Sequence, residues 1–562
     1  MYLCDKIVWI VIYYSDAGET MSNIVRGTML LTAATFLSKF LGMIYVIPFN
    51  ELVGETGGTL FNFAYTPYNI LISISTVGVP LAVSKFVSKY NSLGDYETGL
   101  RMFKAGVTMM MVTGFLAFLA LFFSAEFLAG KMITGDNADG ISVADVTMVI
   151  RMVSFALLII PAMSIVRGFF QGYQSMGPTA ISQVIEQIVR IAFLLVAAFV
   201  VIKVYGGTIA TAVGFATFAA FIGALASSAV LWMYWKKRKA NITKNLEQQR
   251  YTHDISTKDL FVELFSYAGP FVLVGLATPL YQLVDQFTFQ RAMAAIGQGE
   301  LWEVPYAAIN FYGHKLVIIP VTIATGLSLA IIPALTKTFT QNDRTLLSNQ
   351  INQALQIILV LVIPAVVGLM SLSDVAYGAL FGLKNIGITG PLLAWYAPVA
   401  LLFALFTVSA AILQGINQQK FAVISLSAGL LVKVLFNIQL IHTFGAKGAI
   451  FGTALAVGTA VVLNLWRVHA SIDFSFKRTY KLSLLIGIFT IIMGLIIWIL
   501  KILLGMFLDY DSSRFAAIIV LLVGVGAGGF VYLWLGYKST LLERVLGNRV
   551  RVLDRVFRKL RL

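Results

Sequence analysis

Cysteine, histidine and charged residues are all scarce in this chain of 562 residues. The single cysteine, Cys4, excludes a disulfide framework and a thiolate metal site. The four histidines lack HExxH spacing, which argues against a zinc hydrolase of that type (His253, His314, His442 and His469). Charged residues make up only 12% of the chain, against about 25% in soluble domains. No polar stretch is therefore long enough to cover even one soluble domain.

What the chain has in abundance is apolar sequence, which accounts for 59% of its residues. A bilayer-spanning helix needs about 20 consecutive apolar residues, and about fourteen segments meet this criterion. Barrel strands would be shorter and would alternate in polarity. The sequence therefore predicts an all-α polytopic membrane protein. Its spans are expected near 24–48, 59–84, 102–125, 147–170, 178–202, 208–235, 260–285, 310–335, 350–372, 391–414, 419–442, 446–467, 480–504 and 514–537.

Basic residues outnumber acidic ones by 41 to 26. In so apolar a chain this excess indicates cytoplasmic loops facing anionic lipid rather than nucleic acid. One alternate set of loops carries most of the lysines and arginines, including the run Lys236–Lys239, and is predicted to be cytoplasmic. The other set carries most of the loop carboxylates, such as Glu51, Glu55 and Asp509. Both termini are then expected to be cytoplasmic.

Each end of the chain has a distinctive pattern. Residues 1–20 contain an apolar run too short to span a bilayer and lack a signal-peptide cleavage pattern. We expect natural translation to begin at Met21, which makes 1–20 an upstream extension. Residues 539–562 place leucine, valine and phenylalanine at helical spacing, with arginine and lysine at the intervening positions, as in an amphipathic helix lying on the anionic inner leaflet.

The chain also shows an internal duplication. Gly78 and its surroundings match Gly326 at an offset of 248 residues, and Gln171-Gly172 matches Gln414-Gly415 at an offset of 243. Each repeat contains six spans, so both copies have the same orientation, as in parallel-repeat transporters with a central cavity between two lobes. The predicted organisation is an N-lobe (21–235), a cytoplasmic basic linker (236–258), a C-lobe (259–470), two added spans (471–538) and the tail (539–562).

Several charged residues fall inside these spans, where each costs about 3 kcal/mol if it faces lipid. We therefore expect them to face protein or water. The cations could line the central cavity and bind a pyrophosphate, which arginine holds through two hydrogen bonds; they are Lys39, Arg167, Arg190 and Lys433.

The acidic residues of the spans allow two interpretations. Glu186 and Asp285 could carry a coupling proton or sodium ion. Alternatively, Glu186 could pair with Arg190 four residues later on the same helix face. His314 and Lys315 lie near the start of a predicted span, so they could also lie simply at the membrane–water interface.

Five short segments resemble the MurJ/SpoVB-type flippases of the multidrug/oligosaccharidyl-lipid/polysaccharide exporter superfamily. They are Arg26–Thr28, Ser38–Gly42, Val46–Phe49, Gly78–Lys85 and Phe170–Gly172. The resemblance covers Met21–Lys538. It implies a flippase in a bacterial plasma membrane that moves undecaprenyl-pyrophosphate-linked sugars, lipid II foremost, to the outer leaflet without a cofactor. It also implies that the last two spans form a groove for the lipid tail.

The family's substrate-contacting arginines are only partly matched. Lys39 stands at the first of these positions, but Tyr45 stands at the second, and the span around Leu71 has none. This departure leaves a capsule or spore-cortex precursor open as the substrate. A cation-coupled multidrug exporter would usually have twelve spans and fewer buried cations. A sugar transferase or polymerase would need clustered acidic metal ligands or a large catalytic domain, and the sequence shows neither.

Overall fold

The computed structural model of the protein describes residues 23–76, 79–133, 140–247, 249, 275–300 and 302–546. Within these ranges every regular element is a helix. The N-terminal helices are α2 (Asn23–Ile44), α3 (Val46–Thr76), α4 (Val79–Ser92), α5 (Tyr96–Met132), α6 (Val143–Ser154), η1 (Phe155–Leu158), α7 (Ile160–Gly172), α8 (Met176–Phe199), η2 (Val200–Val204) and α9 (Ile209–Glu247). Residues 1–20, most of the linker 236–258 beyond α9, and residues 547–562 of the tail lie outside the described residues.

The remaining helices make up the C-terminal part of the described chain. They are α11 (Ala277–Ala295), α12 (Glu303–Ala307), η3 (Ala308–Tyr312), α13 (Gly313–Thr340), α14 (Arg344–Ser371), α15 (Ser373–Phe381), α16 (Ile386–Tyr396), α17 (Val399–Gly415), α18 (Gln419–Phe444), α19 (Ala446–Ile472), α20 (Lys477–Gly505), α21 (Arg514–Lys538) and α22 (Leu541–Leu546).

Helix length and composition confirm a polytopic helical membrane protein. Eleven candidate spans among the described residues are long and apolar enough to cross a bilayer, and the bent pair α2–α3 raises this to twelve. Of the remaining predicted segments, the second span falls on α3 and α4, and 260–285 falls partly on residues outside the description. The count of fourteen is compatible with the structure and stays a prediction.

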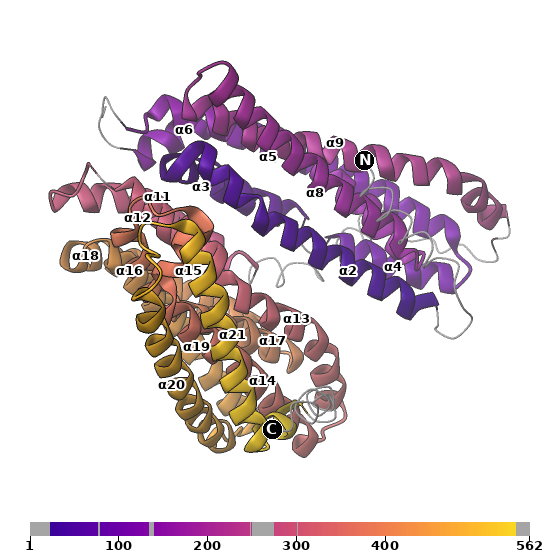
Figure 1. The fold of residues 1–562 in the computed structure, drawn as a ribbon. Coiled ribbons are helices and arrows are strands. Elements are labelled where there is room, and N and C mark those ends of the chain that lie inside the picture. Colours follow the sequence, from indigo (N-terminus) through magenta and orange to yellow (C-terminus); the bar gives the residue numbers. More distant parts are fainter. Residues whose placement is uncertain are drawn as a thin grey trace.

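The helices form two bundles, which we call the N-lobe (α2–α9) and the C-lobe (α11–α19), with α20 and α21 packed on the C-lobe (Figure 1). The bundles meet where α3 packs against α11, α12 and η3. Away from this contact the two bundles diverge, on the side of the molecule where α2, α4 and α13 are labelled (Figure 1). We call the region of contact the closed end. The exact domain boundaries predicted from the sequence stay predictions.

Gly54 turns the chain back on itself at the closed end. Its backbone (φ 63°, ψ −163°) is not helical and interrupts α3. Phe49 and Phe61 lie twelve residues apart, which would separate them by about 18 Å along a straight helix. Their ring centroids are instead 5.4 Å apart. The first span therefore runs through α2 to Gly54, and the second span returns alongside it.

The backbone conformation of Gly54 is essentially restricted to glycine, and forcing a side chain into it costs about 1–3 kcal/mol. We expect Gly54→Ala to lower thermal stability in detergent accordingly. Gly130→Ala is the matched control, because Gly130 lies within α5 and a new Cβ there would contact nothing within 4 Å. That substitution should leave stability equal or slightly higher. Equal melting temperatures for the Gly54→Ala protein and its parent would contradict the strained turn.

The predicted duplication has structural counterparts in both lobes. Asp95 caps α5 and Asp343 caps α14, each by accepting a hydrogen bond from a backbone N–H three residues on. Gln174 and Asn417 follow the ends of α7 and α17 with nearly the same positive φ, 55° and 58°. These pairs have the offsets of 248 and 243 residues found in the sequence. The similarity supports two repeats of the same orientation.

Candidate functional site

A polar network centred on Asn62 ties the two lobes together at the closed end. The Asn62 side chain donates a hydrogen bond to the carbonyl of Asn310 (3.0 Å) and accepts one from the hydroxyl of Tyr306 (2.7 Å). The amide of Gln286 donates to the Asn62 carbonyl at 2.9 Å and to its side chain at 3.2 Å. All these bonds cross from α3 to α11, α12 or η3. Separating the lobes here would break them together.

A second tie is made by Glu303 at the start of α12. Its carboxylate accepts a hydrogen bond from the hydroxyl of Thr56 (2.6 Å) and another from the backbone N–H of Ile141 (3.1 Å). Its carbonyl accepts one from the hydroxyl of Thr59 (3.1 Å). One residue of the C-lobe thus binds two separate segments of the N-lobe, so the closed end is held by polar bonds as well as by apolar packing.

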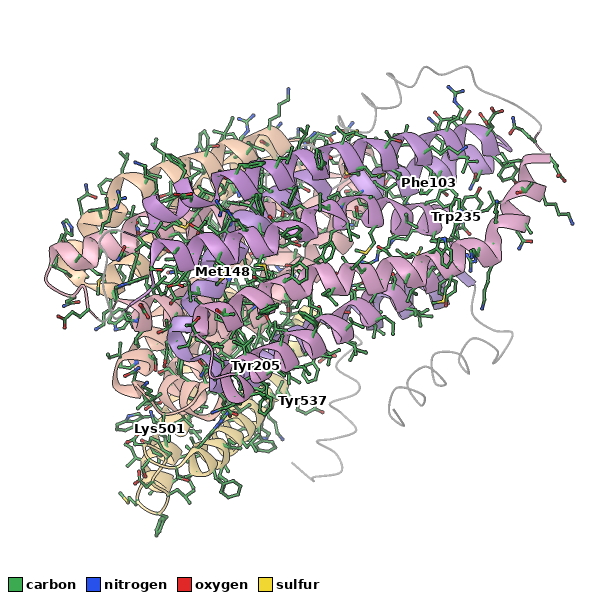
Figure 2. All side chains as sticks on the ribbon, turned by 90° about the horizontal axis from the view of Figure 1, so that it is seen from above. Phe103, Met148, Tyr205, Trp235, Lys501 and Tyr537 are labelled. Atoms are coloured by element: carbon green, nitrogen blue, oxygen red, sulfur yellow. The ribbon has the colours of Figure 1, made fainter. Side chains whose placement is uncertain are left out.

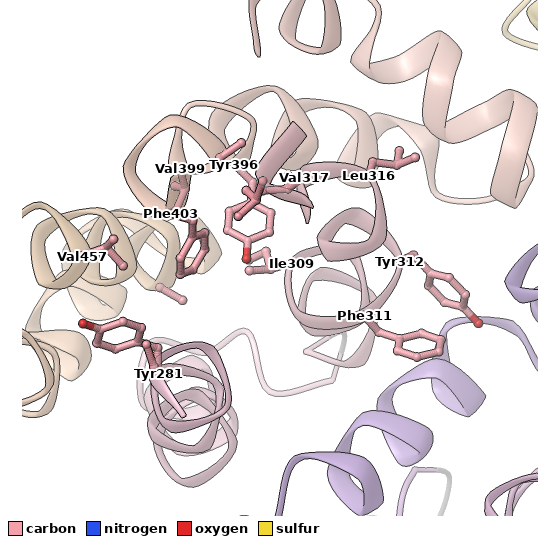
Figure 3. Close-up of a cluster of buried hydrophobic side chains, with 14 of the residues drawn as sticks. Tyr281, Ile309, Phe311, Tyr312, Leu316, Val317, Tyr396, Val399, Phe403 and Val457 are labelled. Carbon is pink, nitrogen blue, oxygen red and sulfur yellow. The ribbon is translucent and has the colours of Figure 1, made fainter. Parts of the chain in front are cut away.

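Next to this closed end, an aromatic bridge joins the lobes and carries a cation at each end. Tyr65 stacks on Phe61 with ring centroids 4.2 Å apart, and Phe61 contacts Phe311 at 5.3 Å. Arg190 lies over the Tyr65 ring at 5.2 Å and donates a hydrogen bond to its hydroxyl. Lys315 lies 5.7 Å from the centroid of the Phe311 ring. Figure 3 shows Phe311 and Tyr312 projecting from η3 toward the neighbouring N-lobe helix.

The two cations of this bridge come close enough to interact electrostatically, and both are half-buried. Neither forms an ion pair of 4.0 Å or less with an acidic group in the part of the chain that the structure describes. Holding like charges near each other away from bulk water is unfavourable, and an anion bound between them would relieve that repulsion. The arrangement is therefore suited to a pyrophosphate, with aromatic faces beside it.

Arg167 and Glu186 form an ion pair inside the N-lobe. Their closest N–O distance is 2.7 Å, and both side chains are less than one-fifth exposed. The same guanidinium donates to the hydroxyls of Ser182 at 3.0 Å and Ser227 at 2.8 Å. Glu186 therefore hydrogen-bonds Arg167 on α7 and not Arg190 on its own helix. This pairing satisfies Arg167 within the lobe and leaves Arg190 for the aromatic bridge.

Lys433 and Asp285 form the most deeply buried ion pair that the structure describes. Their side chains are 0% and 2% exposed, and the ammonium lies 2.8 Å from the carboxylate. Lys433 also donates to the hydroxyl of Thr453, and the amide of Asn437 donates to Asp285 at 3.0 Å. Asp285 thus already has a cation beside it. Lys433 lies inside the C-lobe and not beside Arg190, even though the duplication places the two at equivalent positions.

Lys39 has a different environment from the other predicted cations. It is exposed on α2 and forms no ion pair with the residues that the structure describes. The helix face next to it packs on α8, since Thr35 donates to Gln183 and a Cβ on Gly42 would lie 3.1 Å from Gln187. The aromatic bridge thus has Arg190 and Lys315 at its ends, whereas Arg167 and Lys433 are each paired with a carboxylate and Lys39 is exposed.

Of the cations predicted for the cavity, Arg190 lies at the aromatic bridge, and Lys315, for which the sequence allowed an interfacial position, lies at its other end. The signal was present, because Lys315 is charged within an apolar span and lies four residues after Phe311, on the same helix face. Asn62 and Tyr65 carried no signal, since polar and aromatic residues are common in spans. Glu303 carried none because it lies between the predicted spans 260–285 and 310–335, where a carboxylate is expected. Among the described residues, no group of three or more histidine, cysteine or acidic side chains could hold a metal ion.

Comparisons with known proteins agree with this architecture. Residues 24–339 match a family described as polysaccharide biosynthesis protein. The chain is 46% identical to the lipid II flippase MurJ of Bacillus subtilis (strain 168), over 94% of this chain and 98% of the relative. It is also 26% identical to stage V sporulation protein B of the same organism, over 78% of this chain and 81% of the relative.

Solved structures show the same fold. A lipid II flippase MurJ in an inward closed conformation matches with a TM-score of 0.64 at 16% identity, over 92% of this chain and 99% of the other. An inward-facing multidrug resistance transporter of the MATE family matches with a TM-score of 0.59 at 14% identity, over 77% and 98%. The resemblance inferred from the short segments is confirmed: the chain is a multi-pass membrane protein that belongs to the polysaccharide biosynthesis protein family and, within it, to the MurJ-type flippases.

Proposed function

We propose that this protein moves an undecaprenyl-pyrophosphate-linked sugar precursor, lipid II foremost, from the inner to the outer leaflet by alternating access. It acts as a transporter and performs no covalent chemistry. The observation that carries the proposal is the pair of cations, Arg190 and Lys315, at the two ends of the aromatic bridge between the lobes. The relative named lipid II flippase MurJ, 46% identical over nearly the whole chain, supports this substrate.

The charge distribution supports an orientation in which the closed end faces outward and both termini lie in the cytoplasm. Glu51, Glu55 and Glu303 lie near the closed end, whereas the run Lys236–Lys239 lies at the far end of α9. Figure 2 shows Phe103 and Trp235, which precedes this run, at one end of the N-lobe and Lys501 toward the opposite end of the molecule. Short basic loops are retained in the cytoplasm.

In this orientation the diverging ends of the lobes admit the head group from the cytoplasm. The pyrophosphate binds between Arg190 and Lys315, and the tyrosine and phenylalanine rings beside them offer apolar faces to the sugars. The lipid tail stays in the membrane, along α20 and α21, which expose many large apolar side chains, Phe515 and Leu522 among them. Neutralising the two cations favours bringing the lobes together on the cytoplasmic side, after which the closed end must open.

The remaining domain and partner assignments follow from the same proposal. Residues 21–235 and 259–470 are the two lobes, 236–258 links them on the cytoplasmic face, and 471–538 form the tail groove. The basic residues of 539–562 and the end of α9 contact anionic lipids of the inner leaflet. A sodium ion or proton that couples through Asp285 would have to displace the ammonium of Lys433 or protonate the carboxylate beside it.

The test is to deplete the protein in its native host, with related flippases absent, and to measure lipid II on each leaflet. We expect lipid II to accumulate on the inner leaflet and to return to the outer leaflet when the protein is restored. Normal outward exposure of lipid II without the protein would reject this substrate. If only the precursor of another lipid-linked polysaccharide accumulates on the inner leaflet, that precursor is the substrate instead.

A further inference from the structure

Arg514, at the start of α21, contacts both lobes at the closed end. Its guanidinium donates hydrogen bonds to the carbonyls of Ala379 (2.9 Å) and Leu380 (3.1 Å), which end α15 in the C-lobe. It also forms an ion pair with Glu51, which lies on α3 in the N-lobe. One side chain of the last long helix therefore joins the outer end of the first span to α15.

The residue before Glu51 makes a parallel contact. The side-chain amide of Asn50 donates a hydrogen bond to the carbonyl of Phe381, and Asn50 is 93% buried. Asn50 and Glu51 thus bind the last residues of α15, one directly and the other through Arg514. Phe381 also packs against Tyr312, with ring centroids 5.1 Å apart, and the hydroxyl of Tyr312 donates to the Gly54 carbonyl at 2.7 Å.

The other added span holds the opposite end of the same short helix. Lys501 on α20 donates to both carboxylate oxygens of Asp374, at 2.6 and 2.7 Å, and Asp374 lies in the first turn of α15. The two added spans therefore bind α15 at its two ends, α20 at the first turn and α21 at the last. Asn50 and Arg514 connect this same helix to the first span.

We propose that Arg514, Glu51, Asn50 and the end of α15 form a clasp through which the two added spans hold the closed end shut. Opening this end moves α3 away from α15 and α21, so the bonds of the clasp must break. The added spans then have a second role besides lining a tail groove, since they set how readily the outer end opens. This inference does not depend on the substrate, and it rests on the proposed orientation, in which the closed end faces outward.

The clasp does not rest on its ion pair alone. The side chains of Arg514 and Glu51 are 34% and 55% exposed, and exposed ion pairs contribute little. The two carbonyl bonds of Arg514 and the buried amide of Asn50 are less accessible to water and are expected to contribute more. Removing Arg514 should therefore favour opening by a moderate factor and should not unfold the protein.

The experiment measures opening directly by cysteine labelling. Ala307 is fully buried on α12, the helix that packs against α3, so Ala307→Cys in a Cys4→Ser background carries the only thiol. A membrane-impermeant maleimide is added outside intact cells, and its rate of reaction is measured. We expect Arg514→Gln to raise this rate about threefold to tenfold, as a moderate shift between two states would. Lys384→Gln, which removes an exposed lysine after α15, is the control and should leave the rate unchanged.

Two further variants keep the result interpretable. Glu51→Gln should raise the rate less than Arg514→Gln, and combining the two should add little, because both remove the same tie. If Arg514→Gln yields no folded protein, Asn50→Ala provides the same comparison, because it removes the buried hydrogen bond from Asn50 to the carbonyl of Phe381. The proposal is overturned if folded Arg514→Gln and Asn50→Ala proteins are labelled at the parent's rate. It is also overturned if Lys384→Gln raises the rate as much as Arg514→Gln does.

Discussion

Replacing both Arg190 and Lys315 by glutamine should abolish transport, and each single replacement should weaken substrate binding about 10- to 100-fold. A hydrogen bond to a charged group contributes about 1.5–3 kcal/mol, and each 1.4 kcal/mol is a factor of ten. The double variant loses the cations at both ends of the aromatic bridge. The measurement is outward exposure of lipid II in cells depleted of the native protein.

Controls for this prediction must separate loss of the site from loss of charge. Arg151→Gln and Lys447→Gln each remove one cation: Arg151 has a 41% exposed side chain paired with Glu126, and Lys447 lies over the Trp395 ring. Both variants should support normal exposure of lipid II. Full activity of the Arg190→Gln, Lys315→Gln double variant would show that the pyrophosphate does not bind at the aromatic bridge.

Replacing Lys433 alone should destabilise the C-lobe by about 3–5 kcal/mol, because it leaves the buried carboxylate of Asp285 without its cation. Lys433→Met keeps much of the side-chain volume and removes only the charge and the hydrogen bonds. Adding Asp285→Leu should restore most of the lost stability, since a well-packed apolar pair can replace a buried ion pair. The measurement is the thermal unfolding temperature of the purified protein in detergent.

The pair also bears on the coupling ion. Because the ammonium of Lys433 already lies beside Asp285, we expect exchange of sodium for potassium to leave the stability of the parent unchanged. The side chains of the N-lobe pair, Arg167 and Glu186, are 17% and 15% exposed. We therefore expect a double replacement of these two residues to change the unfolding temperature less than loss of the Lys433–Asp285 pair does. A Lys433→Met protein as stable as its parent would contradict the idea that this pair supports the C-lobe.

The fold class was accessible from the sequence because apolar length alone specifies membrane helices. The duplication was also visible, and its offsets recur in the caps Asp95 and Asp343. What hydropathy could not give was the chain reversal at Gly54, since a glycine in an apolar run is equally compatible with a continuous helix. The turn depends on Phe49 packing against Phe61, which is a tertiary contact.

The site was only partly predictable for a related reason. Charge in an apolar span indicates that a residue avoids lipid but does not say which neighbour it meets. Glu186 was placed beside Arg190 by helix spacing, yet it binds Arg167 on another helix. Lys433 was equated with Arg190 by the duplication, yet Lys433 forms an ion pair with Asp285 inside the C-lobe, whereas Arg190 donates a hydrogen bond to Tyr65. Pairings between helices decide which cations remain for a ligand.

The most direct measurement is translocation of fluorescent lipid II by the purified protein in liposomes. We expect liposomes with the parent protein to move lipid II between leaflets, and liposomes with the Arg190→Gln, Lys315→Gln double variant to behave like protein-free ones. Equal translocation by the parent and the double variant, both folded and correctly inserted, would contradict the role given to Arg190 and Lys315.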